Sequence, residues 1–265
     1  MQYTFGFIGC GNMGGALVSA VSKNVDGAKI AVTDYCQDKV TALVDRLGVT
    51  PATANEIARE SKFVVLGVKP QNMAETLAQI AEILQDRTDV VVISMAVSTP
   101  ISKIRALIGA ELPVIRIMPN TPVAVGAGMV LYDTAGVCEA DENEFLQAFD
   151  KAGRFDKLPE DKIDSASALS GCGPAFVYAF AEALADGAVE CGVPRDKAIL
   201  YASQTLLGSA EMLLTYGHPA DLKDAVCSPG GTTIAGMHAL ENGSMRGAVM
   251  DAVLSAYKRA LELKK

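Results

Sequence analysis

The chain has 265 residues, half of them apolar and a fifth charged, which is typical of a folded protein of one large domain or two domains of ordinary size. Its net charge of −8 and the lack of a basic stripe argue against nucleic acid as a partner. Residues 1–5 have neither the basic start nor the cleavage site of a signal peptide, and no uncharged apolar run has the length of a membrane span. We therefore expect a cytoplasmic protein that has no membrane partner.

A glycine-rich loop, residues 9–14, follows the first expected strand, residues 3–8, and leads into a helix whose apolar residues recur at helical spacing. The loop is a G-x-G-x-x-G motif between a strand and a helix. Gly9 allows the tight turn, Gly11 lets the backbone approach a pyrophosphate, and Gly14 lets the helix pack closely on the strand. The motif in this position predicts dinucleotide binding rather than a glycine-rich turn without a ligand.

A second strand, 29–34, ends at Asp34, twenty residues beyond Gly14, where an acid that binds the ribose is expected. A carboxylate there accepts hydrogen bonds from the adenosine 2′-hydroxyl and repels a 2′-phosphate. The next residues, Tyr35 and Cys36, include no arginine. The sequence therefore predicts that NADH is preferred to NADPH.

Strands and helices continue to alternate up to residue 118. Apolar strands are expected at 63–68, 90–95 and 113–118, with helices at 74–84 and 100–108 between them. Short apolar strands separated by helices predict an α/β fold with a doubly wound, mainly parallel sheet covered on both faces. Ligands of such sheets bind beyond the carboxyl ends of the strands, where small residues and prolines follow each strand here, although ordinary turns have the same composition.

The alternation stops after residues 153–162, and every later segment is predicted to be helical. We place the boundary at residue 160, which divides the chain into a dinucleotide-binding domain, 1–160, and an all-helical domain, 161–265. The expected helices are 163–169, 175–191, 195–216, 220–227, 232–242 and 245–263.

Many apolar residues of the expected helical domain are alanines. Small side chains allow close helix contacts, which favours a subunit interface and a dimer, although a monomeric core would give a similar pattern. Glu182, Asp186 and Glu190 recur every four residues and favour a solvated face over a binding site.

Two breaks interrupt the helical segments. Residues 226–234 read VCSPGGTTI, in which the proline ends one helix and Gly230–Gly231 permits a positive φ. One hydroxyl, from Thr232 or Thr233, is enough to cap the next helix, and the surplus of hydroxyls favours an anion site at a helix N-terminus. Residues 170–174, SGCGP, form a second break of similar chemistry that faces the first or is a plain kink.

The cysteines and histidines limit the chemistry. Six cysteines occur without a CxxC pair or a nearby histidine, so neither a metal site nor a disulfide scaffold is predicted, and we expect most of them to be buried thiols in a reducing cytoplasm. Neither His218 nor His238 lies in an expected site segment, which leaves Lys69 as the candidate for a basic residue near the nicotinamide.

Five segments together resemble the 1-pyrroline-5-carboxylate reductase family, in order and across essentially the whole chain. The SGxGPA and SPGGTT segments are far more specific than the nucleotide fingerprint. The resemblance implies an N-terminal Rossmann domain, a C-terminal helical dimerisation domain and dimers that assemble into a decamer. It also implies that the enzyme transfers hydride from NAD(P)H to 1-pyrroline-5-carboxylate to give L-proline. The segments are 6–14, 67–71, 116–129, 168–195 and 222–241.

The same resemblance implies the site residues. The substrate carboxylate would lie on the backbone N–H groups and hydroxyls of Ser228, Gly230, Gly231, Thr232 and Thr233, and Thr233 would act as the catalytic residue by directing its hydroxyl at the ring nitrogen. The cofactor would contact Ile8, Gly9, Cys10, Gly11, Asn12, Met13, Asp34, Asn55, Gly67, Val68, Lys69, Pro70, Ser94, Met95, Ala96, Asn120 and Pro122.

The imine substrate that the resemblance implies agrees with the residues of the expected site. Reduction of a ketone needs a proton donor, whereas a cyclic imine protonated in solution accepts hydride without one. The lack of an acid in the expected site is therefore consistent with an imine substrate.

This chain departs from the family pattern at two positions. Members often use NADPH, whereas Asp34 predicts NADH, and some members have asparagine where this chain has Ala225. Two alternatives stay open at this point: a reductase of another cyclic imine or a 3-hydroxy acid, and a nucleotide-sensing protein without turnover.

Overall fold

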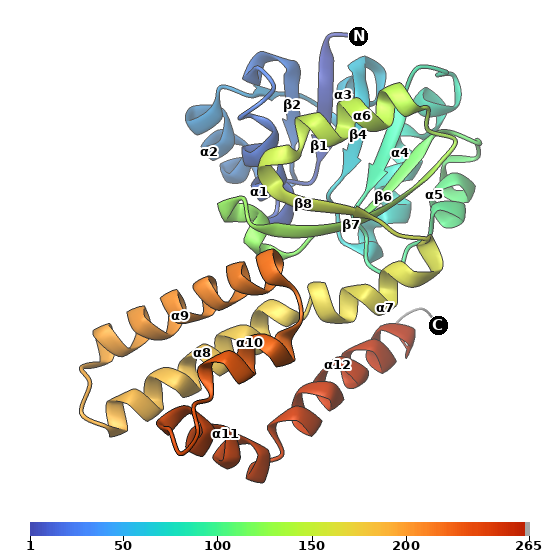
Figure 1. The fold of residues 1–265 in the computed structure, drawn as a ribbon. Helices are drawn as coiled ribbons and strands as arrows, with labels where there is room; N and C mark the ends of the chain where they lie inside the picture. The colour runs from blue at the N-terminus through green and yellow to red at the C-terminus, as the bar shows by residue number, and fades with distance from the viewer. Residues whose placement is uncertain (263–265) are drawn as a thin grey trace. The chain divides into compact units, whose positions relative to one another are not determined.

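The computed structural model describes residues 1–262 and divides into two compact units (Figure 1). The first unit contains Met1–Gly171 and the chain end from Tyr257, and the second contains Cys172–Ala256. Each unit is described by itself below.

The first unit is built on one eight-stranded sheet with the order β3-β2-β1-β4-β5-β6-β7-β8. Strands β1 to β6 are parallel, which confirms the expected mainly parallel, doubly wound sheet, and β7 runs antiparallel to β6 while β8 pairs parallel with β7. The strands are β1 (Tyr3–Ile8), β2 (Ile30–Thr33), β3 (Thr50–Pro51), β4 (Ser61–Leu66), β5 (Val91–Ser94), β6 (Val114–Met118), β7 (Gly128–Ala135) and β8 (Gly153–Lys157).

Helices cover both faces of this sheet (Figure 1), because the strands are apolar on both sides. One core contains Leu17, Leu43 and Phe145 from the helices on one face, and the other contains Leu77 and Ile104 from the helices on the opposite face. The helices of this unit are α1 (Asn12–Val21), α2 (Gln37–Leu47), α3 (Ala54–Glu60), α4 (Met73–Gln85), α5 (Ile101–Ile108), α6 (Glu139–Ala148) and α7 (Glu160–Ser170).

Helix α7 packs on the first unit. This unit therefore extends to Gly171, eleven residues after the boundary that the sequence predicted at 160. Ile163 is fully buried in a cluster with Met118 and Leu131. The Arg116 guanidinium donates to Asp164 Oδ1 at 2.8 Å, and both side chains are almost completely buried. A buried ion pair and an apolar cluster therefore attach α7 to β6 and β7, which the helical periodicity of 163–169 could not indicate.

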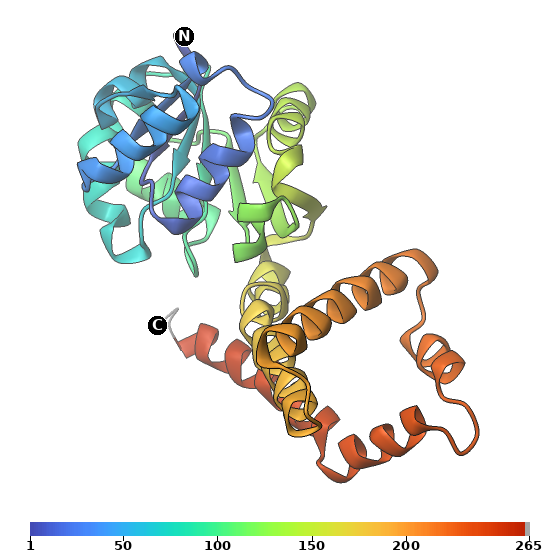
Figure 2. The same ribbon diagram turned by 90° about the vertical axis from the view of Figure 1, so that its left-hand side faces the viewer.

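The second unit contains only helices, as the sequence predicted. Helices α8 and α9 are joined by a short turn and pack on each other (Figure 1). The remaining helices follow in chain order and make few contacts with this pair (Figure 2). They are α8 (Gly173–Glu190), α9 (Arg195–Tyr216), α10 (Pro219–Val226), α11 (Thr232–Asn242) and α12 (Met245–Glu262), of which α12 belongs to this unit up to Ala256. Helix α12 was predicted to extend to residue 263, which lies outside the described residues.

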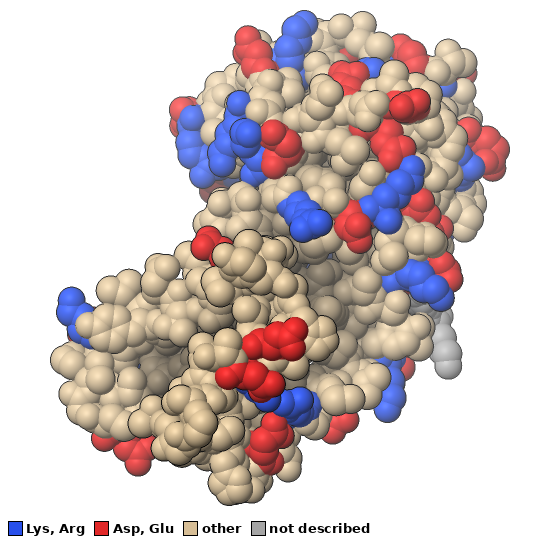
Figure 3. Space-filling model, viewed as in Figure 1, with Lys and Arg blue, Asp and Glu red and all other residues tan. Residues whose placement is uncertain are grey.

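This helical unit buries almost no apolar side chain within itself. The buried residues of its core cluster are Ala185, Ala198 and Ala202. Leu214 is 76 % exposed and Met250 65 %, and the charged side chains on the visible face gather over α10 while most of the rest of that face is uncharged (Figure 3). An apolar surface of this extent marks an interaction site.

By length and composition, the stretch Glu160–Glu190, which contains α7 and α8, could cross a membrane: its mean hydropathy is 1.3, and 11 % of its apolar window is buried. It also carries charges at Asp164, Glu182 and Asp186.

One expectation from the sequence is wrong. The cysteines are not mostly buried: all six are free, and Cys10 is buried, Cys227 is half-buried and the other four are exposed.

Candidate functional site

The glycine-rich loop has the geometry that its motif predicted. Gly9 has φ +102°, and a Cβ there would lie 2.7 Å from the carbonyl carbon of Gly67. A Cβ at Gly14 would lie 2.2 Å from the carbonyl oxygen of Gly9. The loop after β1 and the loop after β4 therefore touch through their backbones, and only glycine permits this approach.

The start of α1 is open toward a ligand. Gly11 is the N-cap in an extended conformation, and nothing lies within 4 Å of the position that its Cβ would take. No side chain caps the helix, so the first N–H groups, including those of Asn12 and Met13, lack a side-chain acceptor. A helix start with free N–H groups and no side chain at its N-cap fits a pyrophosphate.

Asp34 lies at the carboxyl end of β2 and is held by two backbone donors. The Cys10 N–H donates to Asp34 Oδ2 at 2.6 Å, and the Cys36 N–H donates to Oδ1 at 2.9 Å. The ammonium of Lys39 lies 3.8 Å from Oδ1. The expected acid is therefore fixed beside the glycine-rich loop, and Lys39, in the first turn of α2, is a charged neighbour that the sequence reasoning missed. Its only signal in the sequence is its place just after the acid.

The other expected cofactor residues share the same edge of the sheet. The parallel strands β1, β4 and β5 end next to one another, which brings Ile8, Gly67–Pro70 and Ser94–Ala96 to one edge. Asn55 lies in the first turn of α3, which begins beyond the carboxyl end of β3. These residues therefore line the edge at which open parallel sheets bind nucleotides.

The Asn120 side chain has a structural task. Its Nδ2 donates to the Ser170 carbonyl at 2.9 Å, and its Oδ1 accepts the Met129 N–H at 2.9 Å. The carboxamide thus ties the loop after β6 to the end of α7 and to the start of β7. Pro122 lies in the 3₁₀ turn that follows.

The SPGGTT segment joins α10 to α11. Gly230 has φ +69°, which favours glycine, and a Cβ on Gly231 would lie 2.3 Å from Ser228 Oγ, so the serine side chain would have to move for a larger residue there. The expected threonine cap is wrong: Gly231 is the N-cap, Thr232 and Thr233 are the first two helical residues, and no side chain caps this end. A residue already in the helix does not point its hydroxyl back at the N–H groups of its own first turn.

The backbone N–H groups at the start of α11 can therefore donate to a ligand. Ser228, Thr232 and Thr233 are exposed, and the first N–H groups of α11 have no side-chain acceptor. The combination of free N–H groups, hydroxyls and the positive end of a helix dipole is suited to a carboxylate.

Cys10 lies in the cofactor loop but is not a reactive thiol. Burial, with the neighbouring Asp34 carboxylate as a second cause, raises the pKa of Cys10 from 9.0 to about 12. Because the folded pKa is raised, the thiol of the unfolded chain ionises first, so this group lowers stability only as the pH rises above 9.0.

A thiol titration checks this assignment. At pH 8 we expect an aromatic disulfide reagent to label exposed Cys36 at least about tenfold faster than Cys10, since the thiolate is the reacting species. Cys10→Ser should leave the fast labelling phase unchanged, and Cys36→Ser should remove part of it. Fast labelling of Cys10 in the folded protein would contradict the assignment.

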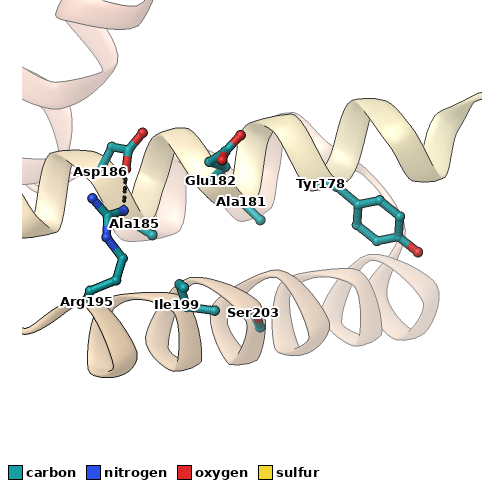
Figure 4. A pocket seen from close by; sticks show the side chains of 8 residues that line it. All are labelled: Tyr178, Ala181, Glu182, Ala185, Asp186, Arg195, Ile199 and Ser203. Atoms are coloured by element: carbon teal, nitrogen blue, oxygen red, sulfur yellow. Dashed lines mark hydrogen bonds and ion pairs between the residues drawn. The ribbon is translucent and has the colours of Figure 1, made fainter.

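A hollow of about 450 Å³ lies between α8 and α9 (Figure 4). Its walls include Tyr178, Glu182 and Ile199, and Asp186 pairs with Arg195 across its end. The acidic face that the sequence predicted as solvated is exposed at Glu182 and Asp186, but it also borders this hollow. The hollow contains none of the predicted substrate residues.

Comparison with known proteins supports this arrangement. A family model described as pyrroline-5-carboxylate reductase dimerisation matches residues 160–263, and one described as NADP oxidoreductase, coenzyme F420-dependent, matches residues 4–98. A pyrroline-5-carboxylate reductase of Pisum sativum is 40 % identical over 266 residues, which cover 99 % of this chain and 96 % of the relative. The chain belongs to the pyrroline-5-carboxylate reductase family.

Solved structures of the family have the same fold. A pyrroline-5-carboxylate reductase from Coxiella burnetii superimposes with a TM-score of 0.91 at 32 % identity, and each chain is covered completely. A pyrroline carboxylate reductase from Plasmodium falciparum, solved with NADP bound, gives 0.86 at 29 % identity, again with complete coverage of both chains. The N-terminal nucleotide-binding unit and the C-terminal helical dimerisation region are therefore those of this family.

Proposed function

We propose that this protein is a pyrroline-5-carboxylate reductase, which combines 1-pyrroline-5-carboxylate, one hydride from NAD(P)H and one proton to give L-proline, the last step of proline biosynthesis. The main observation behind this proposal is that α11, which begins in SPGGTT, starts without a side-chain cap. The glycine-rich loop of the same chain fits a dinucleotide. The family membership of the whole chain supports the same reaction.

The substrate-binding part of the proposal concerns residues 228–233. The carboxylate of the substrate would accept hydrogen bonds from the N–H groups at the start of α11 and from the hydroxyls of Ser228 and Thr232. Thr233 would direct its hydroxyl at the ring nitrogen. Since Gly231 has no side chain and Gly230 turns the backbone with φ +69°, the N–H groups are open to a small planar ligand.

Proton supply needs no further residue. A cyclic imine that enters protonated already has an electron-poor carbon, and the amine that forms keeps that proton. The chain then contributes orientation and electrostatics, which are the main sources of rate in such a site. This explains why neither His218, 72 % exposed at its side chain, nor His238 is needed near the SPGGTT segment.

The cofactor, when bound, supplies the hydride from its reduced nicotinamide. The residues present fit a dinucleotide, because Gly9, Gly14 and Gly67 let the loops after β1 and β4 approach through their backbones, Gly11 leaves open space where a Cβ would lie, and α1 starts without a side-chain cap. We propose that Gly9–Met13 bind the pyrophosphate, that Asp34 and Asn55 lie at the adenosine end, and that Gly67–Pro70, Ser94–Ala96 and Pro122 lie toward the nicotinamide.

The test is an assay of the purified protein with 1-pyrroline-5-carboxylate and either NADH or NADPH, followed by cofactor absorbance and by detection of proline. We expect turnover with both cofactors and a higher kcat/KM with NADH. Turnover with 3-hydroxy acids or with larger cyclic imines, and none with 1-pyrroline-5-carboxylate, would favour the alternative reductases. Binding of NAD(P)H without hydride transfer to any imine would favour a nucleotide-sensing protein.

Asp34→Ser tests the proposed preference for NADH. The change removes a carboxylate that repels a 2′-phosphate, so we expect the ratio of kcat/KM for NADPH to that for NADH to rise by about tenfold. The neighbouring variant Cys36→Ser, which keeps the backbone donor to Asp34, is the control. A wild-type enzyme already strongly selective for NADPH would show that the interpretation of Asp34 is wrong.

We propose that the helical unit makes the protein a dimer, and that dimers assemble further into the decamer of the family resemblance. The exposed apolar side chains of this unit and the hollow between α8 and α9 support a partner surface. Light scattering should give two or ten times the chain mass of 27.7 kDa. A mass of one chain at micromolar concentration would contradict the proposal.

We also propose a cytoplasmic enzyme without a membrane partner, although Glu160–Glu190 has the composition of a span. Its first third is α7, in which Ile163 and Asp164 are buried against β6 and β7, so α7 is held by contacts within the protein. Fractionation of cells should recover the enzyme without detergent.

A further inference from the structure

The carboxylate of Asp34 has a cationic neighbour at the adenosine end of the expected cofactor site. Lys39 Nζ lies 3.8 Å from Asp34 Oδ1. The Asp34 side chain is 12 % exposed and the Lys39 side chain 49 %. The acid is therefore held in the structure, while the long side chain of the lysine reaches it from solvent.

The backbone fixes the acid in place. Oδ2 accepts the Cys10 N–H, Oδ1 accepts the Cys36 N–H, and Gln37 Nε2 donates to the Asp34 carbonyl at 3.0 Å. A carboxylate offers about four acceptor sites, so about two remain for a ribose hydroxyl and for Lys39. Asp34 can thus bind a 2′-hydroxyl without moving.

The lysine has no such restraint. Its contact with Asp34 is longer than a hydrogen bond, and half of its side chain is exposed. The other cation of α2, Arg46, lies in the last turn of that helix and donates to Ser19 Oγ at 2.8 Å. Lys39 is thus the cation of α2 that can turn toward an anion placed beside Asp34.

We propose that Asp34 and Lys39 together determine cofactor specificity: Asp34 accepts the 2′-hydroxyl of NADH, and Lys39 neutralises the 2′-phosphate of NADPH, so that both cofactors are used. The inference rests on the proposed function for the identity of the cofactor. It explains how a chain with an acid at this position belongs to a family with an NADP-bound member. The same pair makes NADPH binding, but not NADH binding, sensitive to salt.

Binding of cofactor fragments tests the pair without the nicotinamide or the imine. Isothermal titration of the purified protein with 2′,5′-ADP and with 5′-ADP measures the contribution of the 2′-phosphate directly. For Lys39→Ala we expect about tenfold weaker binding of 2′,5′-ADP at low salt and about unchanged binding of 5′-ADP, because one charge-assisted contact is lost. The control is Lys23→Ala, which removes an exposed charge after the end of α1, at the amino ends of the strands.

A double variant decides whether the two residues act as a pair. Asp34→Ser should strengthen 2′,5′-ADP binding, and this gain should shrink by about tenfold in Asp34→Ser/Lys39→Ala. Raising the salt from about 50 mM to about 500 mM should weaken 2′,5′-ADP binding in the wild type and have little effect in Lys39→Ala.

Three outcomes would overturn the proposal: no binding of 2′,5′-ADP to the wild type, equal loss of both fragments in Lys39→Ala, or an equal loss in Lys23→Ala. Each is distinct from failure of the proposed function, which would appear as absent turnover of 1-pyrroline-5-carboxylate with intact fragment binding.

Discussion

Replacing Thr233 with alanine should lower kcat/KM for 1-pyrroline-5-carboxylate by about tenfold or more. One hydrogen bond directed at the reacting charge contributes about 2–4 kcal/mol to transition-state stabilisation. The hydroxyl is exposed and does not cap α11, so its loss should leave the fold and NADH binding intact. Steady-state kinetics with saturating NADH, together with a cofactor titration, separates the two effects.

Two variants control this experiment. Thr233→Ser keeps a hydroxyl at the same position and should retain most of the activity. Thr215→Ala removes a hydroxyl that donates to the Glu211 carbonyl in α9, and it should leave the kinetics unchanged. Wild-type kinetics for Thr233→Ala would remove this residue from the mechanism.

Arg116→Leu should destabilise the first unit by about 3–5 kcal/mol. The change removes the guanidinium that donates to Asp164 and leaves that carboxylate buried, which costs more than the loss of a surface ion pair. Arg116 also contacts Glu160 Oε1 at 3.2 Å, and that oxygen accepts the Ile101 N–H at the start of α5. The attachment of α7 should therefore loosen.

Urea unfolding followed by NADH fluorescence reports on this unit, because the cofactor residues lie within it. Arg154→Leu is the matched control: Arg154 is exposed on β8, and its replacement should change the free energy of unfolding by less than about 0.5 kcal/mol. If Arg116→Leu is as stable as Arg154→Leu, the buried pair does not hold α7.

Local patterns were enough to predict most of the fold. The apolar run of residues 3–8 gave β1 with its observed limits, and the helices predicted at 195–216 and 232–242 match α9 and α11. The strands β3, β7 and β8 and the helices α2, α3 and α6 were not predicted. The sequence of β8, GRFDK, is mostly polar because the strand lies at the edge of the sheet, and the reversal of β7 depends on its pairing with β6, which no local pattern encodes.

The candidate site was predicted less completely than the fold. Glycine spacing predicted the tight turn at Gly9 but not its contact with Gly67, because the second loop is remote in sequence. The proximity of Lys39 to Asp34 was not predicted, because it depends on the turn between β2 and α2 and not on the two residues that follow the acid. The prediction that a threonine caps α11 was wrong by one residue. The helical backbone dihedral angles begin at Thr232, which makes Gly231 the N-cap, and the positions of the hydroxyls alone do not indicate this.

The three buried alanines of the helical unit have a consequence for biogenesis. The first unit contains two complete apolar cores, so it can fold while the ribosome still holds the rest of the chain. The second unit has no comparable apolar core. Its apolar side chains therefore stay exposed until the helices bind a second copy of the chain. Formation of the native enzyme should then follow second-order kinetics and become slower on dilution. At low expression levels, newly made chains should depend on chaperones for longer.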